Sequence, residues 1–378
     1  MADNDNLTTV LSGLELTKWR KRFIREYVRD SGFEPYMSVS PNSIIHVVND
    51  LQTNGYTIRV PLIKSLKGVG VKGNERLSGK EEKLDQYYQD IAWDYYRNAI
   101  EISKKERGKS AVDIAGVRYP LLRDWAAELI KYDLIAQFHA INGAPYSAAS
   151  LEARNAWMEA NKDRILFGND VSSLAKASGN HASALKSIAK GSDKLSPALI
   201  SKAKRLAKVA RPRIRPYRTG TQGREYFVLF CDPLCFRDLK NSDAMQQANR
   251  EARPRDVENN PIFQDGDLIY DGVIAREIPE FQSPRFEADE INQETHLKNV
   301  GTGNTDVGVN FLCGAQAIGF VNKQAPMPTS KNENDYRFFD GSGVELAHGI
   351  EKLTWNNGDG TRKDVGIFTI YAAASADS

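Results

Sequence analysis

The clearest hydrophobic pattern lies in residues 112–141 and predicts a long helix from residue 121 onward. Apolar side chains recur there at steps of three and four, which is the spacing of one helical face. Pro120 is expected in the first turn, where a missing N–H costs nothing. Asn142-Gly143 is expected to end the helix, because glycine readily adopts left-handed backbone angles. The apolar face consists of Leu122, Trp125, Leu129, Tyr132 and Ala136, with Ile130, Leu134 and Phe138 beside them.

A second pattern, alternation of apolar and polar positions, predicts a pair of strands. Residues 56–62 alternate, residues 65–82 are rich in glycine and charge, and the Tyr, Ile and Trp content of 87–95 favours a strand over a helix. Pro61 cannot donate to a sheet, so the first strand should lie at an edge. We predict a long hairpin over 56–97. Because a two-stranded hairpin alone is marginally stable, we expect support from outside the subunit.

The remaining chain mixes helices and strands without a repeating βαβ rhythm, which predicts an α+β fold. Residues 195–210 predict an amphipathic helix with Ser196 as its N-cap and Pro197 in its first turn. Further helices are expected at 19–28, 151–164 and 237–253. Strands are expected at 43–51, 226–230, 268–274 (broken by Asp271-Gly272), 307–312, 317–321 and 366–371. We expect strand 43–51 and the strands of the C-terminal third to cover the long helix.

Composition narrows the class of protein. With 378 residues, of which 41% are hydrophobic and 26% charged, the chain can form two or more packed regions. No apolar run approaches the ~20 residues that cross a bilayer, so no membrane partner is expected. The N-terminus lacks the basic and apolar parts of a signal peptide, which makes export by that route unexpected.

The net charge of +2 hides an uneven distribution along the chain. Residues 186–218 carry eleven Lys or Arg and one acid, whereas residues 232–298 carry fifteen acids and eight Lys or Arg. Two interpretations remain open. Both segments are solvated surface, or copies of the chain meet basic face to acidic face, which would steer their association.

Several motifs suggest chemistry but lack the context that the chemistry requires. The GxGxxG at 68–73 is followed by charged residues instead of an apolar helix, so it does not predict a dinucleotide site. None of the five histidines has a second ligand at metal-binding spacing, and His139 is expected to be a packing or capping residue. Cys231, Cys235 and Cys313 are expected to be reduced thiols. We predict no enzyme, no metal site and no cofactor.

Three groups of short blocks occur in a particular order along residues 19–281. They are residues 22–27 (RFIREY) with 35–37 (PYM); residues 56–62 (YTIRVPL) with 93–99, Leu122 and Trp125; and residues 214–217 (IRPY) with 225–230, 232–233, 238–239, 260–263 and 270–273. Their order and spacing resemble the major capsid proteins of tailed phages of the N-four-like kind, which have the Hong Kong ninety-seven type of capsid fold. The last hundred residues carry little that matches.

The resemblance implies a structural protein that self-assembles into hexamers and pentamers of an icosahedral head enclosing double-stranded DNA. Such a protein belongs to the virion capsid and is assembled in the host cytoplasm. The resemblance also implies a division of the chain into an N-terminal arm (1–42), a peripheral domain (43–214) with an extended loop (56–97) and a spine helix (120–141), an axial domain (215–300), and C-terminal strands that return to the core (301–378).

Candidate contact residues follow from the same resemblance. Contacts between copies are expected at Trp19, Phe23, Tyr27, Lys64, Lys67, Lys72, Arg76 and Lys80. The inner face would meet packaged DNA, and the basic helix is a candidate for that contact through Lys202, Lys204, Arg205 and Lys208. Portal, scaffold and decoration proteins are further candidate partners. The alternative function is an intracellular nucleic-acid-binding protein acting through residues 186–218, and a DNA titration would separate the two hypotheses.

Overall fold

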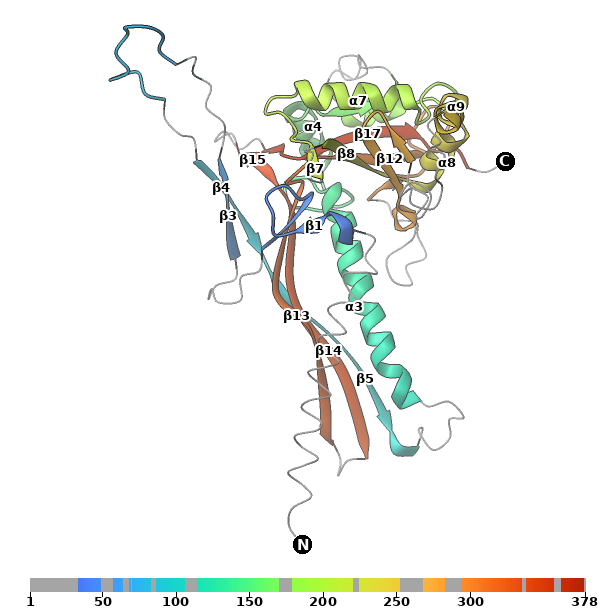
Figure 1. Cartoon of the computed structure of the whole chain (residues 1–378). Helices are drawn as coiled ribbons and strands as arrows, with labels where there is room; N and C mark the ends of the chain where they lie inside the picture. Colours follow the sequence, from blue (N-terminus) through green and yellow to red (C-terminus); the bar gives the residue numbers. More distant parts are fainter. Residues whose placement is uncertain are drawn as a thin grey trace.

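The fold combines a long narrow sheet, a wide sheet and a projecting hairpin, with one long helix beside both sheets (Figure 1). The computed structural model describes residues 33–48, 57–63, 68, 70–82, 86–105, 114–169, 179–219, 224–251, 268–282, 294–334, 338–356 and 362–376. Within these ranges, no helix combines the length and the hydrophobicity that a bilayer crossing requires.

The long helix is α3 (Ile114–Phe138), and its 25 residues make it about 37 Å long. The helix begins earlier than the sequence predicts, so the expectation that Pro120 lies in its first turn is wrong. Pro120 lies inside the helix, where it removes one backbone hydrogen bond. After the helix ends, Asn142 and Gly143 take φ values of 54° and 84° and form the turn of a small bridge between Ile141 and Ala144.

The long sheet has five strands in the order β1-β2-β13-β14-β5 and packs against α3. Its central strands β13 and β14 are antiparallel, and β14 pairs with β5 on its other side. The strands are β1 (Met37–Ser38), β2 (Ile45–Val48), β13 (Ile318–Asn334), β14 (Phe339–Lys352) and β5 (Asp94–Ser103), and the short helix η1 (Glu34–Tyr36) precedes β1. Figure 1 shows α3 running alongside this sheet.

The wide sheet has the strand order β6-β17-β12-β8-β10-β9, with β11 paired to β12 and β7 to β8. Its strands are β6 (Ile165–Phe167), β7 (Tyr217–Thr219), β8 (Arg224–Cys231), β9 (Leu268–Tyr270), β10 (Val273–Glu277), β11 (His296–Leu297), β12 (Val307–Cys313) and β17 (Ile367–Ala373). Around it lie α4 (Leu151–Ala160), α6 (His181–Lys186), α7 (Pro197–Val209), α8 (Pro233–Asn241), α9 (Asp243–Glu251) and the short helix η2 (Pro279–Phe281).

Alternation along the wide sheet divides its core into two layers, because successive side chains of a strand point to opposite faces. On one face, Phe230 and Phe311 pack against Phe138 at the end of α3, with ring centroids 5.3 and 5.6 Å away. On the other face, Phe227 and Leu229 pack in the layer that α7 and α8 cover. The face of α3 is therefore covered by β2 and the strands of the C-terminal third, as the sequence predicts.

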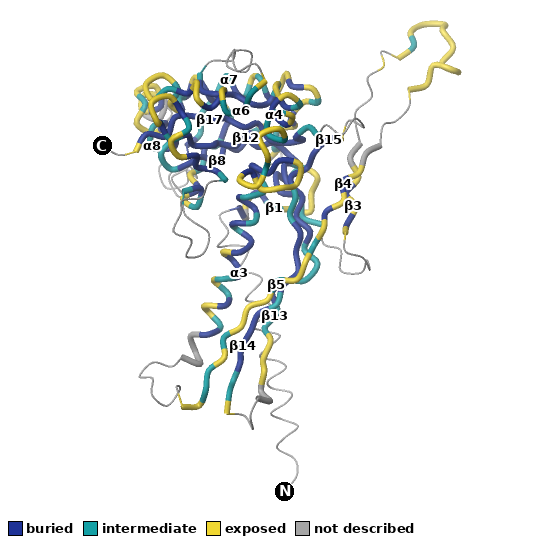
Figure 2. The backbone as a smooth tube through the Cα atoms, turned by 180° about the vertical axis from the view of Figure 1, so that it is seen from behind, coloured by how far each residue is buried: buried dark blue, intermediate teal, exposed yellow. Residues whose placement is uncertain are grey.

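The predicted hairpin is present as β3 (Thr57–Ile63) and β4 (Gln86–Ala92), which form a two-stranded antiparallel sheet of their own. Trp93 separates β4 from β5, so the second half of the predicted aromatic strand joins the long sheet instead. Pro61 lies in β3, which pairs with β4 alone, as expected for an edge strand. Figure 2 shows the tip of the hairpin as exposed and the wide sheet as largely buried.

Two element predictions require correction. Residues 237–253 do not form one helix. α8 starts at Pro233, directly after its N-cap Asp232, and ends before Ser242, and α9 is a separate helix. The segment 268–274 is not one interrupted strand. Asp271 and Gly272 have φ values of 47° and 68°, and this left-handed pair turns the chain back so that β9 and β10 form a hairpin.

The strands and helices of the two sheets do not follow the domain ranges that the resemblance implies. The expected boundary at residue 214 does not separate them, because β6 and the helices α4, α6 and α7 lie with the wide sheet. Conversely, β13 and β14 from the C-terminal third form the centre of the long sheet. Two short strands, β15 (Thr354–Asn356) and β16 (Arg362–Asp364), pair with each other. In the chain they lie between β14 of the long sheet and β17 of the wide sheet.

Candidate functional site

The candidate functional surfaces are the hairpin and the basic helix, and the structure describes part of each. Trp19, Phe23, Tyr27, Lys64 and Lys67 lie outside the described residues, as does the helix predicted at 19–28. The three remaining contact candidates, Lys72, Arg76 and Lys80, are exposed at the hairpin tip (residues 70–82). Lys80 forms an exposed ion pair with Glu75, with a distance of 2.8 Å between Nζ and Oε2.

The root of the hairpin is fastened to its own subunit. Ile58, Val60 and Ile91 are buried in a small cluster, here called the root cluster, which also contains Val321, Leu353, Trp355 and Val365. The side chain of Gln89, which is 7% exposed, bonds to the backbone of the segment between β14 and β15. Its Nε2 donates to the carbonyl of Lys352 at 2.9 Å, and its Oε1 accepts from the N–H of Thr354 at 2.8 Å. Gln89 thus substitutes for a backbone pairing, and no local sequence signal indicates this role.

The exposed face of the hairpin carries contacts between its own two strands. Arg59 donates from Nε and Nη2 to the two carboxylate oxygens of Asp90, at 2.7 and 3.0 Å, and its guanidinium lies 3.9 Å from the ring centroid of Tyr88. Tyr88 and Leu77 are 59% and 60% exposed, although both are large and apolar enough to be buried in a contact. The hairpin therefore presents charge and unburied apolar surface together, as protein interfaces do.

The basic helix α7 has the predicted cap and apolar face. Ser196 accepts a hydrogen bond from the N–H of Leu199, and Pro197 begins the helix. Lys202 donates to the carbonyl of Asn169, and Lys204 forms an ion pair with Asp271 at 2.8 Å. That bond is the main reason why the pKa of Asp271 lies below its ordinary value. Two of the four DNA-facing candidates therefore already have partners within the chain.

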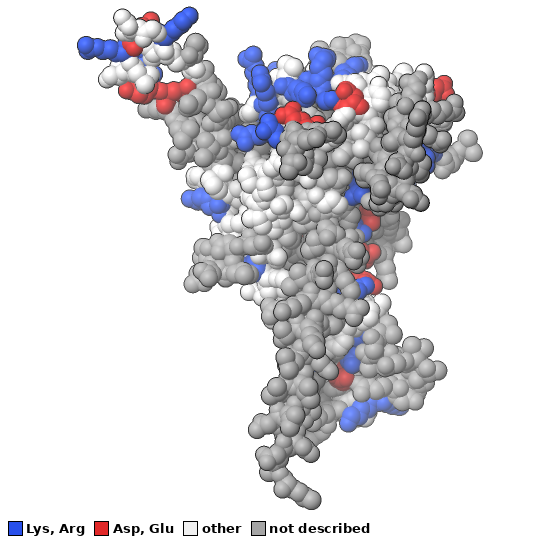
Figure 3. Space-filling model, viewed as in Figure 1, with Lys and Arg blue, Asp and Glu red and all other residues white. Residues whose placement is uncertain are grey.

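The other two candidates, Arg205 and Lys208, are exposed on the outer side of α7. Figure 3 shows Lys and Arg side chains gathered at this end of the molecule. Three exposed arginines, Arg211, Arg213 and Arg215, follow directly after α7. They lie in the basic segment 186–218 but were not named individually as DNA-facing candidates. The alternation of charged and apolar residues in RPRIR was the available signal for them.

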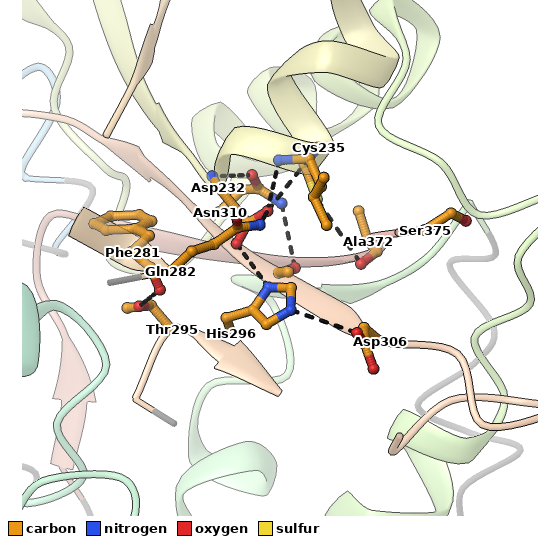
Figure 4. Close-up of polar contacts among 12 residues, drawn as sticks. Asp232, Cys235, Phe281, Gln282, Thr295, His296, Asp306, Asn310, Ala372 and Ser375 are labelled. Carbon is orange, nitrogen blue, oxygen red and sulfur yellow. Dashed lines mark hydrogen bonds and ion pairs between the residues drawn. The ribbon is translucent and has the colours of Figure 1, made fainter. Parts of the chain in front are cut away.

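A buried polar cluster lies at the start of α8, where a catalytic role must be considered (Figure 4). His296 donates from Nδ1 to Asp232 at 2.9 Å, and its Nε2 lies 3.7 Å from Asp306. Burial opposes protonation of His296, but the two carboxylates outweigh it and raise its pKa above the ordinary value. Asp232 also caps α8 and accepts from Gln282 at 3.0 Å. The cluster joins four chain segments, at Asp232, Gln282, His296 and Asp306. His296 and Asp232 are 2% and 0% exposed, which leaves no access for a substrate.

Two other buried histidines, His139 and His181, form a neutral hydrogen-bonded chain through Tyr371. His139 donates from Nδ1 to the carbonyl of Glu294, so its Nε2 must accept from the hydroxyl of Tyr371, at 2.7 Å. The Tyr371 oxygen in turn accepts from Nε2 of His181, at 3.3 Å. Burial lowers the pKa of His139 well below its ordinary value, and burial with nearby Arg154 lowers that of His181 to about 4. The expectation that His139 is a packing residue is confirmed.

The thiols also lack the properties of a reactive site. Cys231, Cys235 and Cys313 are buried and form no disulfide, and burial raises the pKa of Cys235 and Cys313 well above the ordinary value for a thiol. A thiol with a raised pKa stays protonated and is a poor nucleophile. Among the described residues, no group of three His, Cys, Asp or Glu side chains could hold a metal ion. The buried polar groups therefore indicate structural roles.

Comparisons with known proteins agree with this structural interpretation. A sequence model of the family described as phage capsid protein matches residues 7–376. The major capsid protein of Pseudomonas phage KPP25 is 26% identical over 380 residues, which cover 96% of each chain. A chain of the cyanophage Pam1 capsid asymmetric unit superposes with a TM-score of 0.79 at 32% identity, over 93% of this chain and 94% of that one. The capsid of Ralstonia phage GP4 gives a TM-score of 0.67 at 19% identity, over 92% of each chain.

The two sheets, the long helix and the projecting hairpin thus define a capsid shell protein of the Hong Kong ninety-seven type. The chain belongs to the phage capsid protein family and is a major capsid protein of the phage head. The family is structural, so the predictions of a non-enzymatic function, an α+β capsid fold and a location in the virion capsid are confirmed. The family match also includes the C-terminal third, where the sequence resemblance had failed.

Proposed function

We propose that this protein forms hexamers and pentamers of an icosahedral head that encloses double-stranded DNA, and that the hairpin β3–β4 lies across a neighbouring copy. The observation that carries the proposal is the contrast within the hairpin. Its buried apolar side chains lie in the root cluster, whereas the described tip residues are exposed apart from the half-buried Val71. A hairpin this long needs further contacts to hold its outer part, and a second copy of the chain is the partner that a shell supplies.

The two sheets suggest how the subunit is divided. We assign α3 and the long sheet to the peripheral domain and the wide sheet with its helices to the axial domain, while residues 1–42 remain the N-terminal arm. This division follows the sheets and replaces the boundaries at 214 and 300. It is supported by α3, which packs along the long sheet and meets the wide sheet through Phe138 near its C-terminal end.

Removal of the hairpin tip tests this function. A variant that lacks residues 65–82, closed by a two-residue turn, should fold but remain unassembled, because the root cluster is untouched. Circular dichroism melting measures folding, and light scattering with negative-stain microscopy measures assembly. A control with residues 70–82 in scrambled order keeps the loop length and charge. Shells from the deletion variant, or a wild-type protein that stays monomeric at all salt and protein concentrations, would contradict the proposal.

Membership in the narrower N-four-like group remains part of the proposal. The blocks at 56–62, 214–217 and 225–230 support it, since they occur in the same order as in that group. An alignment of these blocks to N-four-like capsid proteins should score above alignments to other capsid proteins of the same fold. Equal scores would show that the blocks reflect the fold alone.

A further inference from the structure

We propose that Arg211, Arg213 and Arg215, here called the arginine ladder, bind the phosphate backbone of double-stranded DNA together with Arg205 and Lys208. This inference rests on the proposed function, in which the protein encloses DNA. It transfers the DNA contact from the middle of α7 to the end of that helix and the extended segment that follows it.

The exposure pattern of residues 211–215 defines the ladder. The three arginines are exposed, Pro212 is half-buried, and Ile214 is 1% exposed. The chain bends at Arg211 and Pro212 and continues through residues 213–215 without a further bend. In such a stretch alternate residues share one side and are about 6–7 Å apart, which describes Arg213 and Arg215 but does not extend to Arg211. Ile214 anchors the segment in the wide-sheet core, and the arginines on either side of it project into solvent.

The backbone of the ladder is fixed by hydrogen bonds, which reduces the entropy cost of binding. The four bonds come from three different places in the fold, so the segment cannot move as a free loop. They join the Arg211 N–H to Asp163 (2.9 Å), the Pro212 carbonyl to Arg164 (2.7 Å), the Ile214 N–H to the Ala207 carbonyl (3.3 Å), and the Arg215 carbonyl to the Ala315 N–H (2.8 Å).

The bond between Ile214 and Ala207 has a second consequence. It returns the segment to the last turns of α7, so the ladder lies beside the part of the helix that carries Arg205 and Lys208. The five cations therefore belong to one surface, at the end of the molecule where Figure 3 shows Lys and Arg gathered. Sequence separation alone did not indicate that the helix and the extended segment share this surface.

The acids around this surface already have partners, which leaves the cations uncompensated. Within the described part of the chain, none of the three ladder side chains forms an ion pair. The nearby carboxylates are held elsewhere: Asp163 by Lys363 (2.8 Å), Asp271 by Lys204 (2.8 Å), Glu225 by Arg218 (3.0 Å), and Asp193 by the N–H groups of Asn169 (2.9 Å) and Ala189 (2.8 Å). An excess of positive charge attracts a polyanion.

The chemistry of the surface favours a duplex over other partners. The surface is mainly charged, with Val209 (66% exposed) as an exposed apolar side chain beside the cations, whereas the centre of a protein interface is usually apolar. The segment also carries no aromatic residue on which single-stranded bases could stack. Repeated guanidinium groups on a rigid backbone fit repeated phosphates, and such contacts carry no sequence information.

The test replaces the ladder in the full-length protein. The variant R211Q/R213Q/R215Q and the control R97Q/K104Q/K105Q remove the same charge from exposed positions, and the control lies on and just after β5, far from the ladder. Binding of two labelled 30-base-pair duplexes of unrelated sequence is measured by fluorescence anisotropy over a salt series. Melting curves verify that both variants are folded.

Loss of the ladder should weaken binding to both duplexes by about tenfold or more at 0.1 M salt. The slope of log affinity against log salt should become smaller by about 2 to 3. The control should match the wild type, and R211K/R213K/R215K should retain most of the binding, because lysine also neutralises a phosphate.

Three results would overturn the inference: no DNA binding by the wild type, an unchanged salt slope in the glutamine variant, or unchanged DNA binding together with a loss of shells in that variant. The last result would make the ladder a contact between copies. Negative-stain images of the same preparations separate this test from the proposed function. Shells from the wild type support the assembly role whatever the titration shows.

Discussion

The helix α3 and the hairpin β3–β4 are both long elements that extend from the centre of the molecule, yet they are held in opposite ways. α3 is covered by the long sheet on its flank and by the wide sheet at its end, and Leu134, Ile135 and Phe138 are completely buried. The hairpin has its buried apolar side chains in the root cluster, and its tip extends away from both sheets (Figures 1 and 2).

This difference teaches where the stability of each element comes from. Burial of apolar surface fixes α3 within a single subunit, because each buried large side chain contributes about 1.5–3 kcal/mol. Among the described residues of the hairpin, only Ile58, Val60 and Ile91 receive that contribution, and the described tip residues do not. Substitutions in the two elements should therefore fail at different stages, folding for α3 and assembly for the hairpin.

The largest effect is expected at the end of α3. Phe138 contacts Phe33, Phe230 and Phe311, with ring centroids 5.3 to 5.6 Å apart. Phe138→Ala should lower the free energy of unfolding by about 3–5 kcal/mol, because it leaves a cavity between α3 and the wide sheet. Denaturant unfolding of the purified subunit measures this. Leu121→Ala is the matched control, since Leu121 lies in the same helix but is 53% exposed. Equal losses in the two variants would contradict the described packing.

Acid should also lower the free energy of unfolding of the subunit, through the buried side chain of His181. His181 has a pKa lowered from its ordinary 6.5 to about 4, so the unfolded chain takes up its proton first as the pH falls. The folded state should lose about 2–3 kcal/mol from this group between pH 7 and pH 4.5. The raised pKa of His296 acts in the opposite direction, since its contribution is present in acid and is lost as the pH rises through that pKa.

His181→Gln isolates the contribution of His181, because glutamine can still donate to Tyr371 but does not titrate. The variant should lose less stability in acid than the wild type, as measured by denaturant unfolding at a series of pH values. The β3 and β4 strands contain no histidine, so their hydrogen-exchange protection should fall in acid only when the whole subunit unfolds. Identical acid curves for the two proteins would show that His181 is not the titrating group.

A smaller effect is expected at the root of the hairpin. Gln89→Leu removes both hydrogen bonds to the backbone at Lys352 and Thr354 and leaves their buried polar groups unpaired, at a cost of about 1–3 kcal/mol. Amide exchange in β3 and β4 should become faster, while exchange in β8 and β12 stays unchanged. Arg76→Gln, at the exposed tip of the hairpin, is the control. Faster exchange in β8 would show that the root is part of the central core.

The sequence was sufficient for elements whose signals are local. The step of three and four residues predicted α3, alternation predicted β3 and β4, and Ser196-Pro197 predicted the start of α7. It was insufficient for β13, where Pro326 and Pro328 argue against a strand. Beyond Val321, β13 no longer pairs with β2 and is an edge strand, and at an edge a proline need not donate a hydrogen bond.

The candidate surfaces divide in the same way. The charge and glycine content of the hairpin tip was enough to predict it, because the composition of an exposed loop does not depend on contacts with distant parts of the chain. Lys202 and Lys204 were selected for their place on α7, but they bond to Asn169 and Asp271, which come from other parts of the fold. Gln89 had no signal at all, because its partners lie more than 260 residues further along the chain.

The smallest effect on stability, and the largest on assembly, is expected at the hairpin tip. The charge reversals Lys72→Glu, Arg76→Glu and Lys80→Glu affect exposed side chains, and surface changes of this kind usually alter stability by no more than about 0.5 kcal/mol each. If the tip binds a neighbouring copy, three reversed charges should prevent shell formation, since like charges facing each other across an interface cost several kcal/mol. The same reversals at Arg97, Lys104 and Lys105 serve as the control. If the tip variant is as stable as the wild type and still forms shells, the tip makes no contact between copies. The contrast between helix and hairpin would then describe the subunit alone.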